Sequence, residues 1–144
     1  MTSRCFVLMV LLAVVGCSDA DTFINNQISR LVANSKESTI DLSRVGPKGW
    51  ERICFIAPYA TNETTNQVLG FEWDSQRNSS IASNDGIFLL VFTSGQRVLA
   101  FAEYPSKSGD FIKSSSSCVS PTDAQFRKEV DRNGWIVLVH QPRR

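Results

Sequence analysis

The chain has 144 residues, which is enough for one domain and a short leader, since domains typically run about 100 to 200 residues. Its 42% hydrophobic and 20% charged residues are typical of a globular protein and exclude a chain that is disordered throughout. Its 15 basic and 14 acidic side chains nearly balance, so no concentrated basic face and no nucleic-acid partner are predicted.

An apolar run lies close to the N-terminus. Arg4 supplies one positive charge, and residues 5–15 follow it without a charged side chain. This run is shorter than the roughly 20 apolar residues of a membrane-spanning helix, and it has the length of the apolar region of a secretion signal. It ends in Val14-Val15-Gly16-Cys17, which resembles the lipobox of a bacterial lipoprotein signal peptide.

The resemblance implies both a processing step and a location. Residues 1–16 would be removed as signal peptide, Cys17 would carry lipid such as palmitate, residues 17–21 would form a tether, and residues 22–144 would form one globular domain. Several acyl chains on that cysteine would hold the protein at the membrane, because a single chain anchors only marginally. Ser18 after the cysteine implies the outer membrane, with the domain facing the periplasm.

Ordinary signal peptidase cleavage is the alternative. Ser18-Asp19-Ala20 has the small-x-small form of such a site, so cleavage can also be expected after Ala20. That cut would release a secreted or periplasmic protein without lipid.

The cysteines divide into three roles once the leader is assigned. Cys5 leaves with the signal peptide and Cys17 carries lipid, so Cys54 and Cys118 remain. In an oxidising compartment such an even pair predicts a disulfide. The sequence has no Cys-x-x-Cys for thiol redox chemistry, and its single histidine completes no recognised ligand spacing. No metal site and no cofactor are therefore predicted.

The first half of the domain alternates helix and strand. Residues 22–35 are predicted as an amphipathic helix, because apolar side chains recur at helical spacing at Phe23, Ile24, Ile28, Leu31 and Val32. Residues 40–45 indicate a short edge strand, and residues 50–57 a strand covered on both faces. Residues 61–69 are predicted as a helix, with Thr61 or Asn62 as N-cap and Gly70 as C-cap.

The second half is predicted to be richer in strand. Residues 71–74 are left open as strand or loop, and residues 75–86 and 105–117 are predicted loops. Residues 87–104 predict a β-hairpin that turns at Ser94-Gly95, with a central first strand. A short helix over residues 121–130, a turn at Asn133-Gly134 and a strand over residues 135–140 complete the chain.

The expected fold is a single small α+β domain. It has an antiparallel or mixed sheet of four to five strands, with about three short helices on one face.

Two places carry side chains with possible chemistry. If residues 71–74 are extended, Glu72 and Asp74 share one face beside Trp73, a pattern that invites a glycan-hydrolase interpretation. The commoner interpretation is a solvated face opposite buried aromatic residues. His140, in the last strand, is interpreted as a strand-end or core residue, because no nucleophile motif accompanies it.

Three hypotheses for function follow. The first is a membrane-anchored envelope lipoprotein that is not an enzyme and binds another envelope protein, as an accessory or structural component. The second is a periplasmic inhibitor or immunity protein against a lysozyme or toxin, by analogy of architecture, with residues 75–86 or 107–117 as binding loops. The third is a hydrolase that uses Glu72 and Asp74.

Overall fold

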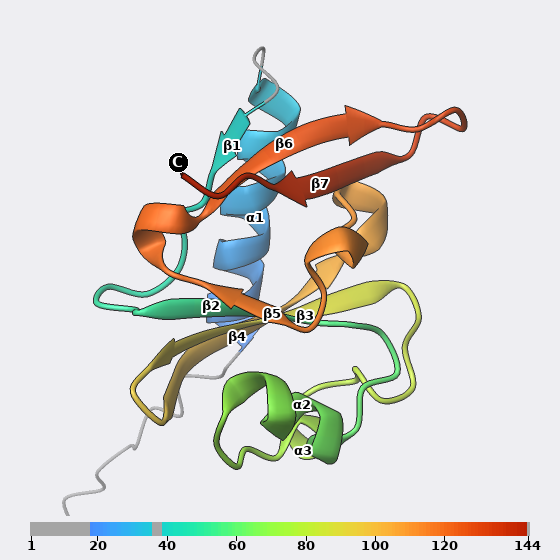
Figure 1. The fold of residues 1–144 in the computed structure, drawn as a ribbon. Helices are drawn as coiled ribbons and strands as arrows, with labels where there is room; N and C mark the ends of the chain where they lie inside the picture. Colours follow the sequence, from blue (N-terminus) through green and yellow to red (C-terminus); the bar gives the residue numbers. More distant parts are fainter. Residues whose placement is uncertain (1–17, 36–38, 144) are drawn as a thin grey trace, which may run out of the picture.

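The computed structural model describes residues 18–35 and 39–143, so the lipobox and Cys17 lie outside the described residues. The fold is α+β, as predicted, with two antiparallel sheets in the orders β1-β6-β7 and β4-β3-β2-β5 (Figure 1). The helices are α1 (Ser18–Asn34), α2 (Asn62–Leu69) and α3 (Ser75–Asn78), with short 3-10 turns η1 (Ser106–Ser108), η2 (Ile112–Ser114) and η3 (Pro121–Asp123). The strands are β1 (Thr39–Asp41), β2 (Arg52–Ile56), β3 (Ile87–Ser94), β4 (Arg97–Pro105), β5 (Ser117–Val119), β6 (Gln125–Val130) and β7 (Ile136–His140).

The four-stranded sheet is the middle layer of the domain. Phe55 and Leu90 on one face pack into the core that α1 and the three-stranded sheet complete. Ile56 and Leu89 on the other face pack into a second core between the sheet and α2 (Figure 1). β3 is buried on both faces between β2 and β4, which explains its continuous apolar run. Helices therefore cover both faces of this sheet, not one face as expected.

Helix α1 begins earlier than predicted. Its buried stripe is Ile24, Ile28 and Val32, but the helix starts at Ser18, so residues expected to form a tether are already helical. Asp21 accepts a hydrogen bond from the Glu103 backbone N–H at 2.9 Å, and the Asn25 side chain donates to the Glu103 carbonyl at 2.9 Å. These bonds dock the first turns of α1 onto the outer edge of β4. Burial raises the pKa of Asp21 despite that hydrogen bond.

The predicted helix over residues 121–130 is wrong. Only the turn η3 is helical there, and β6 follows it as the central strand of the three-stranded sheet. Phe126 and Val130, four residues apart, fit one face of a helix and equally one face of a strand. The segment forms a strand because β1 on one side and β7 on the other exchange hydrogen bonds with its backbone N–H and C=O groups. The chain thus has seven described strands in two sheets, where four to five in one sheet were expected.

Three other segments differ in detail. The strand expected over residues 40–45 is limited to β1, and the predicted loop 75–86 opens with the single turn α3. The predicted loop 105–117 contains η1, η2 and the first residue of β5. Elsewhere the structure agrees with the predicted caps: Thr61 caps α2 in a capping box, and Gly70 ends it in the left-handed conformation (φ 81°).

No helix in the described part of the chain is long and apolar enough to span a membrane.

The disulfide between Cys54 and Cys118 is present, as predicted. The two cysteines are direct cross-strand neighbours on β2 and β5, with Cα atoms 4.0 Å apart. The bond closes a sequence separation of 64 residues. The chain-entropy model assigns a loop of that length a stabilisation on the order of 4 kcal/mol.

Phe111, in the predicted loop, is the centre of the aromatic core. It is fully buried, and its ring lies 4.8 to 6.4 Å from the rings of Phe55, Phe88, Tyr104 and Phe126. Those four rings come from β2, β3, β4 and β6, so one side chain contacts both sheets. Such aromatic pairs stabilise beyond the area that they bury.

Replacing Phe111 with alanine is expected to destabilise the domain by about 3 to 5 kcal/mol, the usual range for deleting a buried phenyl ring. Its neighbour Ile112 is 52% exposed, so Ile112→Ala is a matched control with little expected effect. Urea unfolding of both variants checks this prediction. Equal destabilisation by the two substitutions would contradict it.

Candidate functional site

The structure brings Glu72 and Asp74 together on the segment that joins α2 to α3. Both line a shallow pocket of about 300 Å³, with Trp73, Asn62 and Asn66 as its other walls. The Trp73 ring packs on Phe101 of β4, at a centroid distance of 5.3 Å. The arrangement therefore has the two carboxylates and the tryptophan that the hydrolase hypothesis requires.

The contacts of Asp74 indicate a structural role. Its Oδ1 atom accepts hydrogen bonds from the Arg77 backbone N–H at 3.1 Å and from the Asn62 amide at 2.9 Å. Asp74 is thus the N-cap of α3. The hydrogen bond from Asn62, together with that from Arg77, holds the pKa of Asp74 below its usual range. A glycosidase acid needs a raised pKa, so these contacts do not favour Asp74 in that role.

The same network joins α2 to α3. Asn62 Oδ1 accepts from the Ser75 hydroxyl at 3.0 Å and from the Gln76 backbone N–H at 2.9 Å. Ser75 is fully buried, and its hydroxyl also lies 3.0 Å from that of Thr65. Glu72 makes no hydrogen bond or ion pair with any residue that the structure describes, so it is the free carboxylate of the pair.

His140 fixes the end of β7. Its Nε2 atom lies 2.8 Å from the Asp123 carbonyl oxygen and 3.3 Å from the carboxylate of the same residue. Its ring packs on Phe126, its cross-strand partner, at 5.5 Å. These contacts tie the last strand to η3, which agrees with the interpretation of His140 as a strand-end residue.

The two predicted binding loops are folded onto the domain. Residues 75–86 contain α3, and Glu103 of β4 accepts hydrogen bonds from the backbone and the hydroxyl of Ser80. Residues 107–117 bury Phe111. The element that projects from the body is instead the β6–β7 hairpin, at the upper right of Figure 1.

Three exposed apolar side chains lie on or beside this hairpin, with Val130 and Trp135 on opposite faces of it. They are Ile112 of η2, Val130 at the end of β6 and Trp135 before β7, exposed by 52%, 61% and 40%. We call these three residues the end patch. Asp110 connects two of them, because its carboxylate accepts from the Ile112 backbone N–H at 2.7 Å and from the Trp135 indole N–H at 2.9 Å. Val130 lies opposite Ile136 on the neighbouring strand.

The turn of the hairpin is fixed by Asp131. Its side chain accepts from the backbone N–H groups of Asn133 and Trp135, both at 2.8 Å. Its own backbone N–H donates to the Trp135 carbonyl at 2.9 Å. These bonds hold Val130 and Trp135 in fixed positions on either side of the turn.

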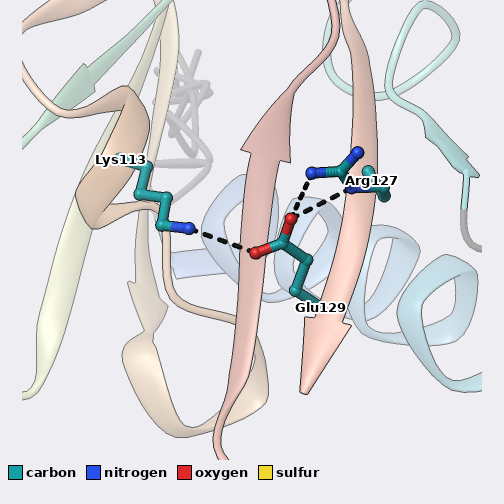
Figure 2. Close-up of polar contacts among 3 residues, drawn as sticks. All are labelled: Lys113, Arg127 and Glu129. Carbon is teal, nitrogen blue, oxygen red and sulfur yellow. Dashed lines mark hydrogen bonds and ion pairs between the residues drawn. The ribbon is translucent and has the colours of Figure 1, made fainter. Parts of the chain in front are cut away.

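A cluster of three charged side chains lies next to Ile112. Figure 2 shows Glu129 between Arg127, also on β6, and Lys113 of η2. Glu129 accepts two hydrogen bonds from the Arg127 guanidinium and one from Lys113 Nζ at 3.1 Å. The hydrogen bonds from Arg127, and to a smaller extent the one from Lys113, hold the pKa of Glu129 below its usual range. Each exposed ion pair contributes little free energy. The pair of Lys113 and Glu129 nevertheless connects η2, which contains Ile112, to β6 across β7.

The sequence does not point to Val130 as an exposed residue of a hairpin, because the spacing in residues 121–130 also fits a helix. Interpreted as a strand, the segment predicts a second hairpin around Asn133-Gly134, with Val130 and Trp135 flanking its turn. Tryptophan is among the residues that contribute most to protein interfaces. Exposed apolar side chains at fixed positions on a projecting hairpin are suited to contact with another protein.

No protein-family model matches the chain, and no curated protein or solved structure matches it.

The two carboxylates of the pocket are expected to differ in their effect on stability. Asp74→Ala should lower the melting temperature by a few degrees at pH 7, because α3 loses its cap. Since the folded pKa of Asp74 lies below the unfolded value near 3.8, this contribution is complete above pH 3.8 and is lost as the pH falls through the folded pKa.

Glu72→Gln is the matched control. It removes a neighbouring carboxylate that has no partner among the described residues, so its melting temperature should equal that of the wild type. Thermal unfolding monitored by circular dichroism at several pH values makes the comparison, and equal shifts for the two variants would refute the cap assignment.

Proposed function

We propose that this protein is a lipid-anchored component of the bacterial cell envelope that binds another envelope protein and catalyses no reaction. The observation that carries the binding role is the end patch, whose three apolar side chains are exposed and held by hydrogen bonds to Asp110 and Asp131. Large exposed apolar side chains on a rigid support are typical of protein–protein interfaces.

The resemblance of Val14-Val15-Gly16-Cys17 to a lipobox supports the anchor. Helix α1 begins at Ser18, one residue after the proposed lipid site, and Asp21 already docks on β4. Lipid on Cys17 would therefore hold the folded domain directly at the membrane surface. In Figure 1 the first turn of α1 lies behind the middle sheet, and the tip of the β6–β7 hairpin lies away from it at the upper right.

The β6–β7 hairpin also supports a second candidate, an inhibitor or immunity protein against a lysozyme or toxin. A projecting arm with an exposed tryptophan near its tip can enter the cleft of an enzyme. Both candidates place the partner at the same surface, and the identity of the partner separates them.

Lipid attachment is tested by labelling bacteria that express the full-length chain with an alkyne analogue of palmitate. The wild type is expected to incorporate the label, and Cys17→Ser is expected to lose it. Cys5→Ser is the matched control, because it removes a cysteine of the leader and should leave labelling unchanged. Persistent labelling of the Cys17→Ser variant would show that Cys17 is not the site of lipid attachment.

The partner surface is tested by crosslinking in intact cells, with a photoreactive amino acid in place of Val130. We expect a defined crosslinked product whose mass spectrum identifies the partner. The control position is Gln67, which is exposed on α2 on the other side of the middle sheet. A lysozyme or toxin in the product would select inhibition, and an assembly protein would select the accessory role. Absence of a product at Val130, or the same product from both positions, would count against the end patch.

A further inference from the structure

A groove runs between α1 and β1, away from the end patch. Its volume is about 570 Å³, within the range of ligand-binding clefts. Gln27, Arg30 and Leu31 of α1 form one wall, and Ile40, Arg44 and Val45 form the other. Gln27 also accepts a hydrogen bond from the Gly46 backbone N–H at 3.2 Å, which holds the two walls together.

The inner surface of the groove is apolar. Leu31, in the last turn of α1, is 38% exposed. Ile40 and Val45 are almost fully buried, and they connect the groove to the core that α1 shares with the two sheets. Apolar side chains of a bound segment would thus meet mainly Leu31.

The groove also borders a free strand edge. β1 is the first strand in the order β1-β6-β7, so β6 occupies only one of its edges. The Leu42 N–H donates to the Ala124 carbonyl at 2.9 Å, which continues the register that pairs Ile40 with Phe126. Because bonding alternates along an antiparallel pair, the backbone groups of Thr39 and Asp41 face away from β6. No residue in the described ranges 18–35 and 39–143 forms a hydrogen bond with those backbone groups.

Two cations stand at the groove. The side chains of Arg30 and Arg44 form no hydrogen bond or ion pair within the part of the chain that the structure describes. Among the lining residues that the structure describes, Asp41 is the one anion, and its carboxylate accepts from the Ser43 backbone N–H at 2.8 Å. The groove therefore has an excess of positive charge beside an apolar floor.

We infer that this groove binds an extended segment of a partner protein, which adds as a strand to the free edge of β1. Its apolar side chains contact Leu31, and its acidic side chains pair with Arg30 and Arg44. This mode of recognition takes affinity from main-chain hydrogen bonds and specificity from every second side chain. The inference rests on the protein-binding role proposed above, and it adds a second surface and the chemistry of the segment that binds there.

The probe is a fluorescein-labelled, N-acetylated hexapeptide of alternating valine and glutamate, titrated into the full-length protein in detergent micelles. Fluorescence anisotropy is expected to show saturable binding. The matched peptide with lysine in place of glutamate should bind at least tenfold more weakly. A third peptide, with proline at a central position, should also bind more weakly because it lacks a backbone donor.

Charge reversal on the protein completes the test. In the double variant Arg30→Glu, Arg44→Glu the preference is expected to switch to the lysine peptide, while the melting temperature stays that of the wild type because both side chains are exposed. Leu31→Asp should weaken both peptides. Failure of the glutamate peptide to bind, equal binding of both peptides, or an unchanged preference in the double variant would overturn the inference.

Two further measurements distinguish strand addition at the groove from lipid contact and from binding at the end patch. Binding of phosphatidylglycerol vesicles that depends on the two arginines, without peptide binding, would identify a lipid-contact surface and would also overturn the inference. Crosslinking from Val130 in the double variant reports on the end patch alone, so the two surfaces can fail independently.

Discussion

The insertion of Phe111 between the two sheets is the contact on which the rest of the domain depends. Its ring meets aromatic side chains from β2, β3, β4 and β6, and so joins sheets that share no strand. Its position also sets that of its neighbour Asp110, whose backbone bonds Ile136 and Leu138 of β7 at 2.8 Å. The Asp110 side chain in turn holds Ile112 and Trp135. The burial of Phe111 therefore sets, through Asp110, the positions of Ile112 and Trp135 in the end patch.

Much of the fold could be predicted where local chemistry and tertiary structure agree. The apolar runs of β2 and β3, the caps of α2 and the turn at Ser94-Gly95 are local signals, and the structure follows each of them. Residues 121–130 could not be predicted in this way, because an apolar pair four residues apart satisfies both periods and only pairing with β1 and β7 selects the strand. Phe111 stands in a run of serine and lysine without periodicity, so its burial depends on distant strands.

The candidate sites also differ in whether local sequence or contacts between distant segments determine them. The disulfide followed from counting cysteines, and the structure pairs Cys54 with Cys118. A shared face of Glu72 and Asp74 was predicted only for an extended segment; residues 71–74 form no strand, yet both carboxylates line one pocket, and Asp74 is also bonded to Asn62, twelve residues earlier. The end patch and the groove of α1 consist of residues from separate elements. A free strand edge exists only relative to the whole sheet, and no sequence pattern in one segment describes it.

The disulfide has a consequence for the order in which the chain can assemble. It closes a loop that contains α2, α3, β3 and β4, whereas β1 precedes this loop and β6 and β7 follow it. The three-stranded sheet is thus built from the two arms that leave the closed loop. Asp41 and its partner Gln125 are 84 residues apart along the backbone, but only 20 through the bond, 13 before Cys54 and 7 after Cys118. Closing the shorter path costs about 1 kcal/mol less entropy, so oxidation converts a remote pairing into a nearly local one.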